Sequence, residues 1–178
     1  MYDFKIKSYD VGYISEISSL TAKPDSVTTR MTFNSSPGRI FRELMFYEEI
    51  AKPPPLFLRL LLPVPVGTEG RISQSGDVVM CMYKGGEHIQ KRITRIVPNA
   101  FYEFEVTRQT LSLRGNIRLI GGCFRLCELP NGQTEVSVET IYYRTGTSPW
   151  YRIMLERKVC KYFHRYLLES IYEKIKTN

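Results

Sequence analysis

Hydrophobic and polar residues alternate through most of residues 71–144, a pattern typical of half-buried β-strands. Five turn signals interrupt the alternation: Ser75-Gly76-Asp77, Gly85-Gly86, Pro98-Asn99, Gly115-Asn116 and Pro130-Asn131-Gly132. Because the turns are short, consecutive strands are expected to pair antiparallel. The sequence therefore predicts an antiparallel meander over this region.

The last turn allows two registers, and the distribution of charge favours one of them. A two-residue loop at Asn131-Gly132 would put Val136 and Val138 on the same face as Arg125. A three-residue loop, with Gly132 in the left-handed region, moves the pairing by one residue and separates apolar from charged side chains. The expected pairs are Phe124 with Val138, Leu126 with Val136, and Ile120 with Tyr142.

The same parity argument assigns an inner face to the earlier strands. Tyr102, Phe104 and Val106 are expected to point inward, with Glu103 and Glu105 outward. On the two preceding strands the inner face is expected to hold Val78, Met80, Met82, Ile89 and Ile93. This assignment also turns three cations inward: Lys91, Arg95 and Arg118.

Two helices flank the predicted meander, and a strand precedes the first. Apolar residues alternate over 27–33, and Ser36 followed by Pro37 suits a helix start, so a helix is predicted from there to about Ala51. Ser148 and Pro149 start a second helix that should run to about Lys174. Its apolar seam is Cys160, Phe163, Leu167, Ile171 and Ile175, widened by Leu155, Val159, Tyr162 and Tyr166.

This order of elements resembles the helix-grip fold of the START-like superfamily, also called SRPBCC, which includes polyketide cyclase/dehydrase-type proteins. The segments that carry the resemblance are SSPGRIFRELMFYEEIAKPPP, GGEHIQKRITRIVPNAFYEFEV, GGCFRLCELPNGQTEVSVET and SPWYRIMLE. The stretch VVMCMYKGGEHIQKRIT further resembles a bacterial branch of the superfamily without assigned chemistry. The resemblance implies an α+β fold in which a curved antiparallel sheet wraps a long C-terminal helix around a cavity.

The resemblance covers about residues 26–176, and we expect residues 26–178 to form a START-like ligand-binding domain. Residues 1–25 lie outside it and are expected to form an arm, with a short strand where Tyr2, Phe4 and Ile6 alternate with charged residues.

In such a cavity the superfamily holds lipids, sterols, polyketides or other hydrophobic molecules. The candidate apolar lining is Met80, Met82, Tyr102, Phe104, Phe124, Tyr142, Trp150, Met154 and Phe163. Inward-facing Lys91 and Arg118 would suit an anionic group on the ligand, because buried cations need a partner. The alternatives are a dry core for the apolar set, and sheet-rim positions or acidic partners for the cations.

Two function classes fit this pattern. The first is binding, with transport or sensing, of a hydrophobic and anionic lipid-like molecule. The second is a polyketide cyclase or dehydratase that works through cavity shape and through Tyr and Arg side chains. No catalytic triad, Walker loop, dinucleotide-binding glycine pattern or metal-ligand set is present, so neither cofactor nor metal is expected. His164 is either a general acid or base or, beside Arg165, a surface residue.

Composition narrows the choice of partner. The chain has 178 residues and a net charge of +7, which favours anionic partners. Specific nucleic-acid binding is not expected, because the basic residues lack an interleaved aromatic platform.

The four cysteines, at 81, 123, 127 and 160, form no C-x-x-C pair, and no secretory signal opens the chain, so a cytoplasmic protein with free thiols is expected. The oligomeric state stays open.

Residues 56–66 (LFLRLLLPVPV) are the most apolar segment between the first helix and the meander. Two interpretations stay open at this stage. With Arg59, and with Arg157, Lys161 and Arg165 of the last helix, the segment could make a peripheral contact with an anionic membrane. Alternatively it folds onto the domain as a lid that closes the cavity.

Overall fold

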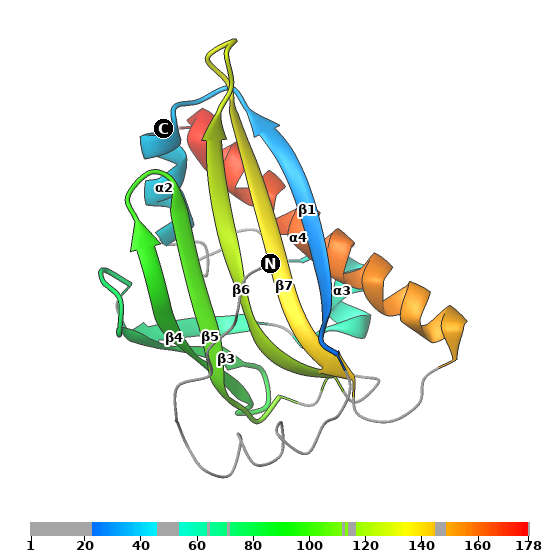
Figure 1. Ribbon diagram of the computed structural model, residues 1–178. Helices are drawn as coiled ribbons and strands as arrows, with labels where there is room; N and C mark the ends of the chain where they lie inside the picture. The colour runs from blue at the N-terminus through cyan, green and yellow to red at the C-terminus, as the bar shows by residue number, and fades with distance from the viewer. Residues whose placement is uncertain are drawn as a thin grey trace.

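A seven-stranded antiparallel sheet and a long C-terminal helix dominate the structure, a computed structural model (Figure 1). It describes residues 23–45, 54–63, 65–70, 72–111, 113, 117–144 and 149–177. The strands are β1 (Asp25–Phe33), β2 (Pro65–Gly70), β3 (Val78–Tyr83), β4 (His88–Val97), β5 (Phe101–Gln109), β6 (Ile117–Glu128) and β7 (Thr134–Arg144). The helices are α2 (Pro37–Met45), α3 (Leu56–Leu61) and α4 (Trp150–Thr177).

The strand order β1-β7-β6-β5-β4-β3-β2 confirms the predicted meander and the α+β fold. Every neighbour from β2 to β7 is also a neighbour in sequence, whereas β1 crosses over to pair with β7. The sheet curves around α4, which lies along its concave side (Figure 1). The edge strand β2 lies before residue 71, where the predicted meander begins. The sequence pattern does not predict this strand, because its residues PVGTEG are mostly exposed and show no apolar alternation. The predicted arm, apart from residues 23–25, lies outside the described residues.

The β6–β7 hairpin has the predicted three-residue loop. Gly132 has a φ of 77°, and the Gly132 amide donates to the carbonyl of Leu129. Phe124 pairs with Val138 and Leu126 with Val136, as expected. The third expected pair is wrong, because a bulge between Leu119 and Gly121 brings Leu119, not Ile120, opposite Tyr142.

The parity predicted for β3 is also wrong. Cys81 pairs with Ile89 and is buried, as is Val79, whereas Val78 is exposed and Met80 and Met82 point to the other face. Both parities of β3 are apolar, so alternation could not choose between them.

Two of the three cations predicted to face inward, Arg95 and Arg118, lie on the outer face of the sheet. A register shift between Ile93 and Arg95 leaves Arg95 exposed against the ring of Phe101. The β6 bulge likewise separates Arg118, opposite Tyr143, from the inner-face residues that follow it. Lys91 alone of the three is buried.

Both predicted helices form. The amide of Ile40 donates to the carbonyl of Ser36, which confirms the predicted start of α2, while the predicted end near Ala51 lies outside the described residues. In α4, Leu167, Ile171 and Ile175 of the predicted seam are buried against α2 and the sheet. None of the helices in the described part of the chain is long and apolar enough to cross a membrane.

Candidate functional site

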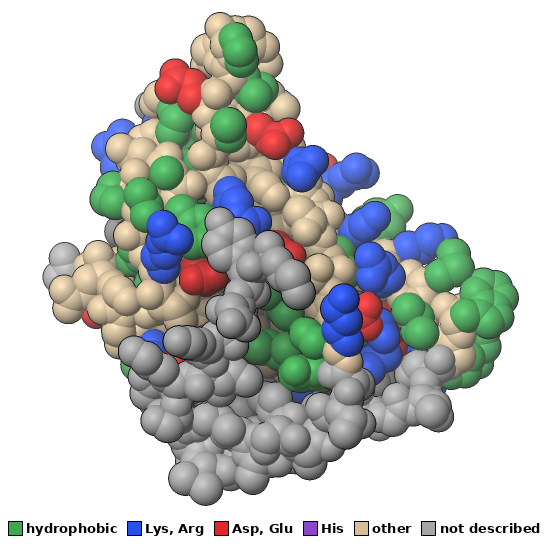
Figure 2. Space-filling model, in the orientation of Figure 1, with side chains coloured by type: hydrophobic (Ala, Val, Ile, Leu, Met, Phe, Trp, Pro, Cys, Tyr) green, Lys and Arg blue, Asp and Glu red, His purple; other side chains and the backbone are tan. Residues whose placement is uncertain are grey.

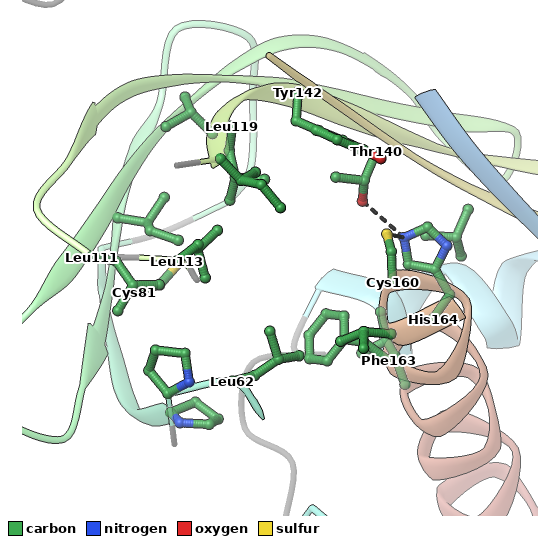
Figure 3. Close-up of a pocket in the computed structure, with 18 of the residues that line it drawn as sticks. Leu62, Cys81, Leu111, Leu113, Leu119, Thr140, Tyr142, Cys160, Phe163 and His164 are labelled. Atoms are coloured by element: carbon green, nitrogen blue, oxygen red, sulfur yellow. Dashed lines mark hydrogen bonds between the residues drawn. The ribbon is translucent and has the colours of Figure 1, made fainter. Parts of the chain in front are cut away.

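A cavity of about 430 Å³ lies between the concave face of the sheet and the helices α3 and α4 (Figure 3). Leu111, Leu113 and Leu119 line one side, and Phe163 of α4 lies across from them. The segment after α3 closes another side with Leu62 and two prolines, Pro63 and Pro65. A cavity of this size and largely apolar lining is typical of small-molecule sites.

The structure brings five of the predicted site residues to the cavity wall: Lys91, Phe104, Phe124, Tyr142 and Phe163. Tyr102 is fully buried in the core, stacked against Phe124. Met80, Met82 and Arg118 are not among the lining residues, which follows from the parity and bulge corrections above. Trp150 and Met154 are exposed, because the first turns of α4 extend beyond the sheet (Figure 1).

Lys91 is the cation that the sheet directs into the cavity. It lies at the centre of β4, between Val79 of β3 and Val106 of β5, and only 9% of the residue is exposed. Its Nζ lies 4.9 Å from the centre of the Phe104 ring, a cation–π geometry. The ammonium therefore adds positive charge beside the apolar side chains of Phe104 and Val106.

His164 forms a polar cluster on the opposite wall. It is 1% exposed, so the expectation of a surface residue is wrong. Its Nε2 lies 2.8 Å from Thr140 Oγ1 (Figure 3). Its Nδ1 lies 3.1 Å from Thr29 Oγ1. Desolvation lowers the pKa of His164 to about 4. The imidazole is therefore neutral at physiological pH, with a threonine hydroxyl at each ring nitrogen.

Cys160 lies one turn before His164 and also lines the cavity. The Cys160 Sγ is 3.6 Å from His164 Nε2. Burial raises the pKa of the Cys160 thiol to about 11. Since the thiol and the imidazole are both neutral, this pair lacks the thiolate that a nucleophilic cysteine requires.

A second polar cluster borders the cavity where α4 meets β7. Arg144 Nε donates to Glu156 Oε2 at 2.6 Å, and Arg144 Nη1 donates to Asp25 Oδ2 at 2.5 Å. Arg144 Nη2 also lies 3.4 Å from the hydroxyl of Tyr142. The side chain of Glu156 is 8% exposed, and its Oε1 is buried without a hydrogen-bond partner among the described residues. Glu156 and Tyr142 both line the cavity, so this cluster supplies its second set of polar groups.

Solved structures of low sequence identity share this architecture. A START superfamily protein from Mycobacterium smegmatis aligns over 85% of this chain and 97% of its own, with a TM-score of 0.59 and 9% identity. The chain has the helix-grip fold of the START-like superfamily. The Zhui aromatase/cyclase from Streptomyces sp. R1128 aligns over 86% of this chain and 94% of its own, with a TM-score of 0.60 and 14% identity. Ara h 8.0201 aligns over 88% and 100%, with a TM-score of 0.59 and 13% identity.

No protein-family model matches the sequence, and no curated protein matches it. The evidence for the helix-grip fold therefore comes from three-dimensional structure. At identities of 9% to 14%, these likenesses concern the fold, and the chemistry of the cavity depends on this chain's own residues.

Sequence reasoning missed Glu156, Arg144 and Cys81 as residues of this site. Glu156 lies four residues before Cys160, so it continues the predicted seam of α4 by one turn, and that spacing was a usable signal. Cys81 was missed with the parity of β3. Nothing in the sequence placed Arg144 beside Glu156, because their contact depends on how α4 packs against β7.

Proposed function

We propose that this protein binds an anionic, lipid-like small molecule in its cavity, with the acyl chain against the leucine-rich wall and the anionic group beside Lys91. The observation that supports this most is the burial of the Lys91 ammonium in a largely apolar cavity. In this largely apolar cavity a carboxylate or phosphate group on the ligand would accept a charge-assisted hydrogen bond from the Lys91 ammonium, and such a bond is stronger there than in water. The leucine side chains favour an alkyl chain through burial of apolar surface.

Binding of dodecanoate and dodecanol tests this proposal, because the two ligands share a chain and differ in charge. We expect the protein to prefer dodecanoate by roughly tenfold, the gain of one charge-assisted hydrogen bond. Lys91→Met is expected to abolish the preference while dodecanol still binds. Lys84→Met removes an exposed lysine at the β3–β4 turn and is the matched control. Equal affinity for the two ligands in the unmodified protein would contradict recognition of the anion, and binding of neither would contradict an alkyl-binding cavity.

A second candidate, carbonyl chemistry of the cyclase or dehydratase kind, has one observation in its favour. Burial raises the pKa of Tyr142, so its hydroxyl stays protonated at the cavity wall and is able to donate to a ligand carbonyl. Tyr142→Phe removes this donor without changing the ring. Turnover of a polyketide-type substrate that is unaffected by this substitution would reject the assignment.

A further inference from the structure

An exposed surface built from α3 and the first four turns of α4 combines large apolar side chains with cations. On α3, Leu56, Phe57 and Leu60 are exposed although Leu58 of the same helix is buried. On α4 the exposed large residues are Trp150, Tyr151, Met154, Leu155 and Tyr162, with Trp150 at 73%. Phe57 packs edge-on against Tyr162 at 6.0 Å between ring centres, so the two helices form one continuous surface.

The cations on this surface share the same side of α4 as the apolar residues. At 100° per residue, Lys158, Lys161 and Arg165 fall within the arc that runs from Trp150 to Leu155. All three are exposed, as is Arg59 of α3. Figure 2 shows blue and green side chains side by side along this end of α4.

Acidic side chains are missing from the same stretch. In residues 56–61 and 150–165 the one acidic residue is Glu156, which points to the cavity and is buried against Arg144. The next acidic residue of α4 on the exposed side is Glu169, beyond the apolar segment. Cations and apolar groups are therefore gathered in one part of the helix, with no exposed carboxylate among them.

We propose that this surface, which we call the docking face, attaches the protein to the headgroup layer of an anionic lipid bilayer. A helix lying in the interface presents Trp, Phe and Leu to the acyl chains and Lys or Arg to the phosphates, and the docking face carries both sets. A protein partner is disfavoured, because the cores of protein interfaces are depleted in lysine whereas Lys158 and Lys161 lie within the apolar arc.

The docking face lies next to one end of the cavity. Leu155 is half exposed on this surface and lines the cavity, and Leu61 and Leu62 line the cavity directly after the exposed residues of α3. One end of the cavity therefore lies beside the surface that would meet the bilayer. Attachment does not depend on which ligand the cavity holds, so this inference stands apart from the proposed function.

Sedimentation of the full chain with phosphatidylcholine vesicles, with and without phosphatidylglycerol, tests the docking face. We expect binding to the anionic vesicles that weakens as salt is raised. The triple variant Lys158→Gln, Lys161→Gln, Arg165→Gln is expected to bind about 100-fold more weakly, because each cation near an anionic surface raises the affinity roughly fivefold. The double variant Trp150→Ser, Met154→Ser is expected to lose binding even at low salt, because it removes the inserted groups.

The matched control carries Lys84→Gln, Arg95→Gln and Arg108→Gln, three exposed cations outside the docking face. It lowers the net charge by the same amount and is expected to bind as the unmodified protein does. Equal weakening in the control and the triple variant would overturn the proposal in favour of unspecific attraction by net charge. Absence of vesicle binding, with concentration-dependent self-association that the Trp150→Ser, Met154→Ser variant removes, would overturn it in favour of a second copy of the chain.

Discussion

The imidazole of His164 is held between two hydroxyls, with Thr140 Oγ1 2.8 Å from its Nε2 on one side and Thr29 Oγ1 on the other. The three residues come from α4, β7 and β1, so this cluster joins the C-terminal helix to the edge of the sheet. It forms only when the strands that carry the threonines are paired and the helix is docked. Its contribution to stability should therefore appear in global unfolding and in its dependence on pH.

Replacing His164 with glutamine should flatten the dependence of stability on pH below neutrality. Desolvation lowers the pKa of His164 to about 4 in the folded protein, against an ordinary value of 6.5, so the unfolded chain binds the proton more readily. The stabilising contribution is full above pH 6.5 and is lost as the pH falls toward 4. Between pH 7 and pH 4 the loss is about 3 kcal/mol. Glutamine keeps one hydrogen bond and does not titrate in this range.

Urea unfolding of both proteins at pH 7 and pH 4 measures this effect. Carboxylates titrate in the same interval, so the quantity that decides is the difference between the two proteins rather than either slope. Parallel pH profiles for the unmodified protein and His164→Gln would show that His164 does not titrate as its burial requires.

Arg144→Met should destabilise the protein by about 3 kcal/mol, because it leaves the buried carboxylate of Glu156 without its counterion. Glu156 is 8% exposed, and Arg144 supplies the hydrogen bond to its Oε2. The double variant Arg144→Met, Glu156→Leu removes the charge as well as its partner and should recover most of the loss. Free energies of unfolding for the single and double variants form the test. If the double variant is less stable than the single one, the cost does not come from the unpaired carboxylate.

Gly121→Ala should cost about 1–3 kcal/mol, the usual range for crowding in a packed interior. A Cβ at Gly121 would meet the backbone carbonyl oxygen of Phe104 on the paired strand, which cannot move without breaking the β5–β6 ladder. Gly67→Ala on β2 is the control, because nothing lies within 4 Å of a Cβ added there. Thermal unfolding should give a lower melting temperature for Gly121→Ala than for Gly67→Ala. Equal melting temperatures would mean that β5 and β6 leave room for a Cβ at Gly121.

Val106→Phe should weaken dodecanoate binding by tenfold or more while leaving stability within about 1.5 kcal/mol. Val106 is buried at the cavity wall, so the larger ring occupies space that the alkyl chain would take. Val97→Phe makes the same exchange at an exposed position at the end of β4 and should not change binding. Unaltered affinity in Val106→Phe would show that the ligand binds outside the cavity.

Local sequence patterns were enough to predict most of the elements and the β6–β7 register between the hairpin loop and Phe124. Ser36 and Pro37 identified the start of α2, and the seam at three- and four-residue spacing identified α4. The β6–β7 register followed from Gly132 and from the position of Arg125 among apolar neighbours, because only one pairing keeps charge off the buried face. These features depend on interactions between residues that are close in the chain, or on a single hairpin.

The site was predicted less completely, and the errors have identifiable causes. The prediction that Met80 and Met82 face inward is wrong, because both faces of β3 are apolar and alternation does not favour either face. Arg95 and Arg118 were turned outward by bulges, which insert one residue into a strand without a strong local signal. Trp150 and Met154 lie on a part of α4 that extends past the sheet, a matter of relative length that only the assembled fold sets.

The sequence by itself predicted β1, α2, the antiparallel meander from β3 to β7 and the long amphipathic helix α4, and it offered an inward-facing Lys91 as one of two alternatives. Only the tertiary structure decided that His164 is buried between Thr29 and Thr140, that Arg144 meets Glu156, and that Leu60 and Trp150 stay exposed on one surface. Periodicity reports which face of an element is apolar, since it follows from the local geometry of helix and strand. It does not show which elements meet, because those contacts join residues of different elements, which lie 135 positions apart in the case of His164 and Thr29.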